Sequence, residues 1–315
     1  MTNQQFDAER VARAKRSVAL LSVLSNSALV ALKLIVGLLI NSVSVIAEGI
    51  HSSLDLVAAL IALLAVKKAS VPPDKEHAYG HGKIENVSGT IEAILIFVAA
   101  ALIIYESVQK LIEGAAVASV NFGLVVMGVS ALANTYVSRR LMKVAKETES
   151  IALEADALHL STDVLTSLGV FAGLILIRLT GLSILDPIVA IVVAMIIIKA
   201  AWELTKTAFL DLMDRTLPLE EQELITSILK EHYPEVVTFH KVRTRRAGSE
   251  RHIDMHVIVT PTTTVENAHE LSNHLEAHIE SKLPNSHIVV HMEPCEEKCP
   301  VCSGDKCHGG EKDDE

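Results

Sequence analysis

The chain has 315 residues, of which 50% are hydrophobic and only 3% aromatic, and its mean hydropathy of +0.38 is high for a soluble domain. These values exclude a disordered chain, and because all four cysteines lie between Cys295 and Cys307, disulfides cannot stabilise the body of the fold. The net charge of −10 arises after residue 210: residues 1–210 hold 17 acidic and 17 basic residues, and residues 211–315 hold 21 and 11. An acidic surface argues against nucleic-acid binding and suits cations.

Six apolar stretches are each long enough to cross a hydrocarbon core of about 30 Å as a helix. They lie at residues 17–39, 43–66, 88–112, 119–138, 157–177 and 183–202. The polar first 16 residues lack the features of a secretory signal, so we expect them to be retained. Basic residues precede the first stretch and follow the second and fourth, which places both termini in the cytoplasm by the positive-inside rule. The sequence thus predicts a multi-pass integral membrane protein.

After Pro218 the pattern changes to short amphipathic elements. They read as a helix at 219–232, strands at 240–246 and 252–260, a helix at 265–283 and a strand at 288–292. The predicted fold class is therefore a membrane all-α domain of six transmembrane helices plus an α+β, ferredoxin-like (αββαβ) cytoplasmic domain. The predicted segments are a cytoplasmic N-terminal segment at 1–16, a transport domain at 17–208, the cytoplasmic domain at 209–294 and a Cys-rich acidic tail at 295–315.

Two identical His-x-x-x-Asp pairs lie within predicted spans, His51 with Asp55 and His159 with Asp163. The four-residue spacing places each pair on one face of its helix. Ionisable groups inside a bilayer are costly and usually mark an ion pathway. Two imidazoles and two carboxylates supply the ligands of a tetrahedral Zn²⁺, so we predict a transport site for a divalent metal. The alternative is that each His pairs with the Asp of its own helix in a structural polar network.

Other polar residues in the spans are weaker signals, because each can line the same cavity or simply serve helix packing. They are Asn26, Lys33, Glu48 and Glu92.

The loop after the second span contains Asp74, His77 and His81, a spacing that can bring three ligands around one ion. All four histidines of residues 1–210 fall in this loop array or in the two His-x-x-x-Asp pairs. This concentration favours a loop metal site over an exposed loop with incidental histidines.

The other ten histidines follow residue 210. Candidate ligands on the predicted strands and second helix of the small domain are His240, His256, His269, His291 and Glu293. No sequence pattern separates the remaining histidines of this domain from ordinary surface residues; these are His232, His252, His274, His278 and His287. In the tail, short intervals between soft ligands indicate a thiolate metal site or, alternatively, reduced thiols without metal. The tail candidates are Cys295, Cys299, Cys302, Cys307 and His308.

Taken together, these motifs resemble those of the cation diffusion facilitators, which are dimeric metal/proton antiporters with six spans and a metallochaperone-like cytoplasmic domain. The resemblance covers residues 10–294. Four segments carry it: SVIAEGIHSSLD ending at Asp55, DKEHAYGHGKIE from Asp74 to Glu85, EADALHLSTD ending at Asp163, and FLDLMDRTLP around Asp214.

The resemblance implies roles for particular residues. His51, Asp55, His159 and Asp163 would form the transport site, and Asp74, His77 and His81 the loop site. His240, His256, His291 and Glu293, with His269 as a further candidate, would bind regulatory metal. Lys83 and Asp214 match a charged pair near the dimer interface of some members. His51 is the form usual among zinc-selective members, whereas Glu293 stands where better-known members have Asp.

The resemblance further implies a homodimer in a lipid bilayer, in a bacterial cytoplasmic membrane, that exports Zn²⁺ in exchange for protons by alternating access. Fe²⁺, Co²⁺, Ni²⁺ and Cd²⁺ are the other candidate cargoes. Two alternatives are an intramembrane zinc hydrolase, with Glu48 as its general base, and a membrane-anchored metal sensor. The hydrolase needs a metal coordination position open to water, which a set of four protein ligands does not leave. A membrane-anchored sensor would have no use for ionisable residues inside its spans.

Overall fold

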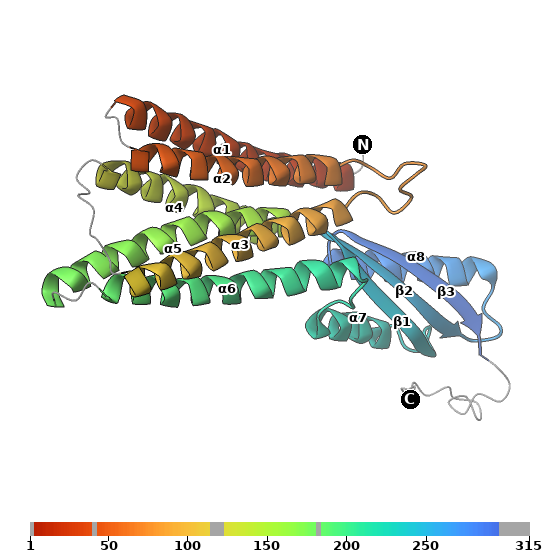
Figure 1. Ribbon diagram of the computed structural model, residues 1–315. Coiled ribbons are helices and arrows are strands. Elements are labelled where there is room, and N and C mark those ends of the chain that lie inside the picture. The colour runs from red at the N-terminus through yellow and green to blue at the C-terminus, as the bar shows by residue number, and fades with distance from the viewer. Residues whose placement is uncertain (1–2, 40–42, 114–122, 181–183, 296–315) are drawn as a thin grey trace. The chain divides into compact units, whose positions relative to one another are not determined.

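The computed structural model describes residues 3–39, 43–113, 123–180 and 184–295 (Figure 1). The chain forms two compact units, Met1–Leu212 and Met213–Glu315. The division falls four residues later than the boundary expected after residue 208, because the last helix of the first unit continues through Leu212.

The described part of the first unit consists of long helices. They are α1 (Asn3–Leu39), α2 (Val43–Ala69), α3 (Lys83–Glu113), α4 (Gly123–Thr148), α5 (Ile151–Thr180) and α6 (Leu185–Leu212). Among the described residues, four segments are long and apolar enough to span a membrane: Glu9–Leu39, Gly49–Ala69, Lys83–Gln109 and Pro187–Leu212. The count of six spans, which adds α4 and α5, stays a prediction.

Small residues allow the helices of the first unit to approach one another closely. α1 packs along α2, α3 along α6, and α4 along α5 (Figure 1). The buried positions of α2 include Ala58, Ala59 and Ala62, which are fully covered. Large apolar side chains instead point outward on the same helices, for example Leu24 at 59% and Leu54 at 64% exposure. Small residues inside and large apolar residues outside are typical of a helix bundle surrounded by lipid.

The second unit is an αββαβ domain, as the sequence predicts. Its elements are α7 (Leu219–Glu231), β1 (Thr238–Ala247), β2 (Glu250–Val259), α8 (Val265–Lys282) and β3 (Ser286–Pro294). The sheet has the order β1-β2-β3: β1 and β2 are antiparallel, and β2 and β3 are parallel, joined through α8. Gly248, at a φ of 61°, provides the left-handed residue of the β1–β2 turn.

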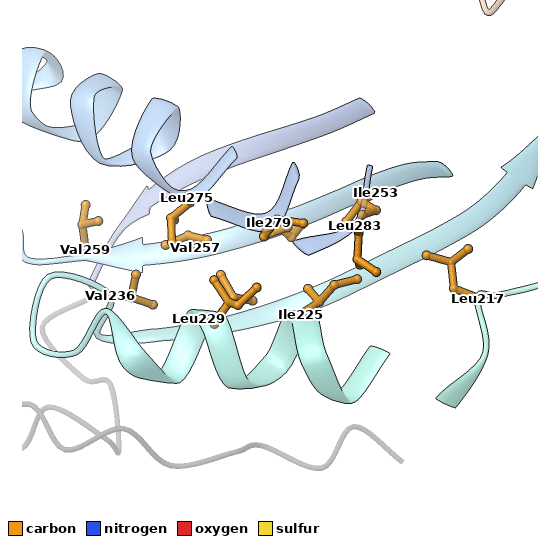
Figure 2. Close-up of a cluster of buried hydrophobic side chains, with 12 residues drawn as sticks. Leu217, Ile225, Leu229, Val236, Ile253, Val257, Val259, Leu275, Ile279 and Leu283 are labelled. Atoms are coloured by element: carbon orange, nitrogen blue, oxygen red, sulfur yellow. The ribbon is translucent and has the colours of Figure 1, made fainter. Parts of the chain in front are cut away.

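Alternation along β2 determines which sheet face is covered. Ile253, Met255 and Val257 are at most 1% exposed and lie in one core with residues of both helices, among them Ile225 of α7 and Ile279 of α8 (Figure 2). Since successive strand residues point to opposite faces, the even-numbered residues of β2 point away from this core. One face of the sheet thus carries the helices, and the other is available for polar side chains.

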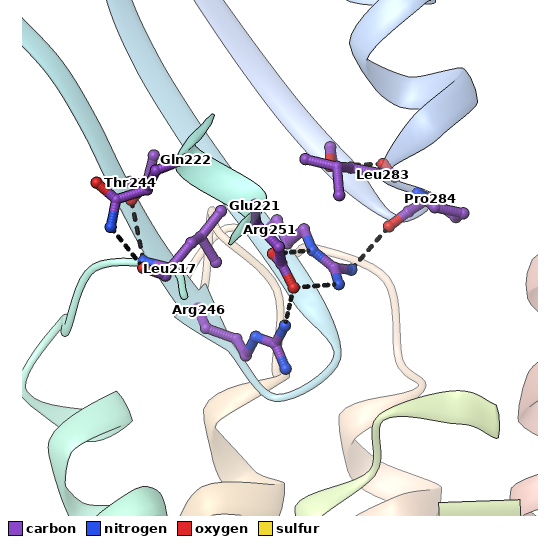
Figure 3. Close-up of polar contacts among 9 residues, drawn as sticks. Leu217, Glu221, Gln222, Thr244, Arg246, Arg251, Leu283 and Pro284 are labelled. Carbon is purple, nitrogen blue, oxygen red and sulfur yellow. Dashed lines mark hydrogen bonds and ion pairs between the residues drawn. The ribbon is translucent and has the colours of Figure 1, made fainter. Parts of the chain in front are cut away.

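A partly buried ion-pair network fixes the start of α7 to the sheet (Figure 3). Arg251 donates from Nε to one carboxylate oxygen of Glu221 at 2.8 Å and from Nη2 to the other at 3.0 Å, and its Nη1 donates to the Pro284 carbonyl at 3.0 Å. Arg246 donates a further hydrogen bond to Glu221 at 2.9 Å. Burial alone would raise the pKa of Glu221, but the two guanidinium groups outweigh it and hold this pKa below its ordinary value.

Candidate metal sites

The strongest candidate in the first unit lies between α2 and α5. His51, Asp55 and Asp163 each offer a ligand atom, and these atoms all lie within 4.8 Å of one another. Asp55 is buried at 5% exposure, Asp163 is half-buried and His51 is exposed. His51 and Asp55 are one helical turn apart, so α2 presents both on one face, and α5 supplies the third ligand. The arrangement can bind a divalent cation through nitrogen and oxygen.

His159 lies beside this group and not within it. Its Nε2 is 3.1 Å from Oδ1 of Asp55, while its buried Nδ1 makes no hydrogen bond within the described residues. Asn134 of α4 donates to Oδ2 of Asp163 at 3.4 Å. Asn134 could not be identified from the sequence, because a lone Asn in an apolar helix has no spacing signal. The structure therefore brings three of the four predicted ligands together and holds the fourth through Asp55.

The weaker candidates in the spans make other contacts. Lys33 donates to Ser52 at 2.7 Å, which links α1 to α2, and Asn26 donates to Ser22 at 3.5 Å on its own helix. Glu92 is fully buried and accepts a hydrogen bond from Ser88 at 3.1 Å. Glu92 belongs to none of the metal-ligand groups of the described residues. The side chain of Glu48 lies outside the described part of the structure.

The loop between α2 and α3 brings its three candidates together. Asp74, His77 and His81 offer ligand atoms within 4.8 Å of one another. The backbone N–H groups of His77 and Glu76 donate to Oδ1 of Asp74 at 2.7 and 2.9 Å, and the hydrogen bond from His77 is the main cause that lowers the pKa of Asp74. Nδ1 of His81 lies 3.3 Å from the Val71 carbonyl, and Nε2 of His81 lies 3.4 Å from Oδ2 of Asp74, where the two atoms are positioned to share a metal ion.

In the second unit, the sheet aligns three histidines in one row on the face away from the helices. His240 of β1 pairs with His256 of β2, which pairs with His291 of β3. Glu293, two residues further along β3, accepts from Nδ1 of His256 at 2.8 Å and lies 3.5 Å from His240 and 3.6 Å from His291. The hydrogen bond from His256 is the main cause that lowers the pKa of Glu293. His240, His256 and Glu293 each offer a ligand atom, and these three atoms lie within 4.8 Å of one another.

His269 does not join this row. It is exposed on α8, where its Nε2 lies 3.3 Å from the side-chain amide of Asn273. Because α8 packs on the opposite face of the sheet, His269 and Glu293 are on different sides of the same unit. Within one chain, this arrangement does not bring His269 to the other candidate ligands, so its role as a metal ligand stays a prediction.

The remaining predicted residues have other partners or lie beyond what is described. Lys83 donates to the Leu212 carbonyl at 3.3 Å, and Asp214 lies 3.4 Å from Arg245. The predicted pairing of Lys83 with Asp214 stays a prediction.

Cys295 is buried, and its backbone N–H donates to the Val259 carbonyl at 2.9 Å. The other tail candidates lie outside the described residues; these are Cys299, Cys302, Cys307 and His308.

A buried ion pair at one end of the helix bundle has no counterpart in the sequence analysis. Lys15 of α1 donates to Glu85 of α3 at 2.8 Å, and both side chains are at most 5% exposed. Ser150, which precedes α5, donates to the second oxygen of Glu85. These residues are 70 and 65 positions apart, so no local spacing indicates that they meet.

Comparison with known proteins agrees with this architecture. Residues 19–213 match the family model described as the cation efflux transmembrane domain, and residues 217–295 match the cation efflux protein cytoplasmic domain. The chain belongs to the cation diffusion facilitator family. An uncharacterised transporter of Synechocystis (sll1263) is 34% identical over 286 residues, which cover 91% of this chain and 92% of that protein. The cation-efflux pump FieF of Cronobacter sakazakii is 30% identical, covering 88% and 92%.

This cation diffusion facilitator is therefore an integral membrane protein of a cation efflux family, which confirms the resemblance found in the sequence. The same membership favours transport over the hydrolase and sensor alternatives.

Proposed function

We propose that this cation diffusion facilitator exports Zn²⁺ from the cytoplasm in exchange for protons. It works as a homodimer in a bacterial cytoplasmic membrane, with six spans and both termini in the cytoplasm. The observation that carries the proposal is the convergence of His51, Asp55 and Asp163 on two helices of the transmembrane domain. Carboxylates inside a membrane are energetically costly unless a cation compensates their charge. Two carboxylates lie close together here, so the arrangement favours a bound cation.

The ligand chemistry favours zinc among the candidate cargoes. A site of oxygen ligands alone suits Mg²⁺, Ca²⁺ or Mn²⁺, and a thiolate site suits Cu⁺. His51 adds an imidazole to the two carboxylates, and His159, whose Nε2 lies 3.1 Å from Asp55, is the candidate for a fourth ligand through that nitrogen. Four such ligands correspond to the tetrahedral coordination that Zn²⁺ prefers.

The replacement His51→Asp should relax metal selectivity. The change exchanges an imidazole nitrogen for a harder carboxylate oxygen, so larger or more oxophilic cations become acceptable. We expect the ratio of Zn²⁺ to Cd²⁺ flux in reconstituted vesicles to fall in this variant. His287→Asp, which makes the same exchange at an exposed histidine outside the proposed metal sites, is the matched control and should keep the wild-type ratio. An unchanged ratio in His51→Asp would show that this residue does not select the metal.

Proton exchange follows from the same ligands. An imidazole must be neutral to bind metal, and its ordinary pKa of about 6.5 lies close to physiological pH. Zn²⁺ and H⁺ therefore compete for His51 and for His159, and loading with one favours release of the other. In the metal-free site, Asp55 is positioned to accept a hydrogen bond from a protonated His159.

The loop and sheet sites serve regulation in this proposal. They lie outside the spanning segments and are built from His and carboxylate ligands that hold Zn²⁺ from the cytoplasm. Metal at the sheet site of each chain would change the equilibrium between conformations of the dimer, limited by its differential affinity for them.

The double variant His256→Ala/His291→Ala should retain transport but lose much of its activation by cytoplasmic zinc. Allosteric coupling is typically about 1–3 kcal/mol, so we expect a decrease of about 5- to 150-fold in apparent zinc sensitivity and no complete loss of flux. The measurement is the transport rate as a function of cytoplasmic-side zinc. The control is His287→Ala, which removes an exposed histidine on β3, the strand that also carries His291. Identical curves of transport rate against zinc for the wild type and the double variant would show that the sheet site does not regulate transport.

A further inference from the structure

Three histidines that no sequence pattern distinguishes meet at the junction of α7 and α8. His232 is the C-cap of α7, and His274 and His278 are one turn apart on α8. The ring centroids of His232 and His274 are 5.1 Å apart, and those of His232 and His278 are 5.3 Å apart. The rings meet edge to face, at interplanar angles of 67° and 61°.

These spacings are those of imidazoles that share one tetrahedral zinc ion. With Zn–N bonds of about 2.1 Å and tetrahedral angles, the centroids of two ligand rings lie about 5 Å apart. His232, His274 and His278 are not among the groups of described residues whose ligand atoms already lie within 4.8 Å of one another, so metal binding requires the rings of His274 and His278 to rotate about their Cβ–Cγ bonds, which moves the ring centroids little.

The imidazole nitrogens of this cluster are suited to metal binding by their hydrogen bonding, spacing and exposure. Nδ1 of His232 lies 2.7 Å from the Ile228 carbonyl, which can only accept, so Nδ1 carries the proton and Nε2 keeps its lone pair. His274 and His278 have the i, i+4 spacing with which one helix face presents two zinc ligands. His274 is exposed and His278 half-buried, so a metal ion can reach the cluster from solvent.

The surrounding charge also favours a cation. The last turn of α7 holds Lys230 and Glu231, whose charges balance, and α8 carries four Glu and one Lys. His232 lies at the C-terminal end of α7, where the helix dipole is negative. Both effects attract a divalent cation to this junction.

We propose that His232, His274 and His278 form a zinc site on the helix-covered side of the cytoplasmic unit. It is distinct from the sheet site, because α7 and α8 pack on one face of the sheet and Glu293 lies on the other. A bound zinc ion ties the end of α7 to the middle of α8, and the fourth coordination position is open to water. The site requires no contribution from transport, so it stands independently of the proposed function.

The test is the number of zinc ions bound per chain in the full-length protein, purified without a histidine tag and equilibrated at a fixed concentration of Zn²⁺. We expect His274→Ala and His278→Ala each to hold one zinc fewer than the wild type, measured by elemental analysis. His287→Ala, which removes an exposed histidine outside the cluster, should keep the wild-type number. Because His274 is exposed, its truncation removes no buried contact, and the variant should fold normally.

Hydrogen exchange gives a second readout. Zn²⁺ should slow exchange of the last amides of α7 in the wild type and in His287→Ala, and this protection should be absent in His274→Ala. Equal zinc numbers in all variants, or equal protection of α7 in His274→Ala and wild type, would overturn the proposal and leave the cluster as packed imidazoles without metal.

Discussion

The replacement Asp55→Asn is expected to lower zinc flux by at least about 100-fold while leaving a folded protein in the membrane. Asp55 is buried, and its carboxylate lies with ligand atoms of His51 and Asp163 within 4.8 Å of one another. It also lies 3.1 Å from Nε2 of His159. Asn keeps the size of the side chain but removes the charge and one acceptor. Loss of an outer partner of a metal ligand already costs about 10- to 100-fold in affinity, so loss of a charged ligand should cost more.

The matched control for this change is Ser53→Ala on the same helix. Ser53 is half-buried and donates only to the Gly49 carbonyl at 3.1 Å, so its truncation should leave flux within about twofold of the wild type. The measurement is initial zinc flux in vesicles that contain equal amounts of each variant. Wild-type flux in Asp55→Asn would exclude this aspartate as a metal ligand.

The second large effect concerns stability. Glu221→Ala should destabilise the cytoplasmic unit by about 3 kcal/mol, because Arg251 and Arg246 lose the carboxylate that compensates their charge. The Arg251 side chain is 5% exposed, so water can replace little of the lost interaction. Hydrogen exchange of β2 amides in the full chain measures the change. Glu220→Ala, an exposed neighbour in the same helical turn, should change stability by less than about 0.5 kcal/mol.

The same ion-pair network predicts a pH dependence. The pKa of Glu221 is lower in the folded unit than its ordinary value of 4.5, so the carboxylate stabilises the fold fully above that pH. As the pH falls below 4.5, protonation removes this contribution, and the stability of wild type and Glu221→Ala should converge. A constant difference between them down to pH 3 would mean that packing, and not charge, is what the variant loses.

Local patterns predicted the elements of the chain more completely than its long-range contacts. Alternation along residues 252–260 predicted β2 within two residues, because one face of that strand is buried and the other polar. The row of His240, His256 and His291 also depends on register and on the irregularity after His240, which no single strand encodes. The ion pair of Lys15 and Glu85 was not predictable for the same reason, since the two residues are 70 positions apart.

The candidate transport site shows the same division between local and distant information. The repeated His-x-x-x-Asp spacing indicated which residues share a helix face, because the period of the helix fixes that relation. It could not indicate that Asp163 approaches His51 while His159 contacts Asp55, because the relative shift of α2 and α5 decides this. Asn134 comes from a third helix and carried no signal of its own.

Zinc movement and proton movement should be coupled in one site. The most direct measurement is zinc accumulation in vesicles that contain the purified protein, with an acidic lumen and a neutral exterior. We expect zinc to accumulate inside as protons leave, and accumulation to stop when an ionophore collapses the pH gradient. Vesicles that contain Asp55→Asn should show neither zinc accumulation nor proton release. Zinc entry at the same rate with and without the gradient would contradict this coupling.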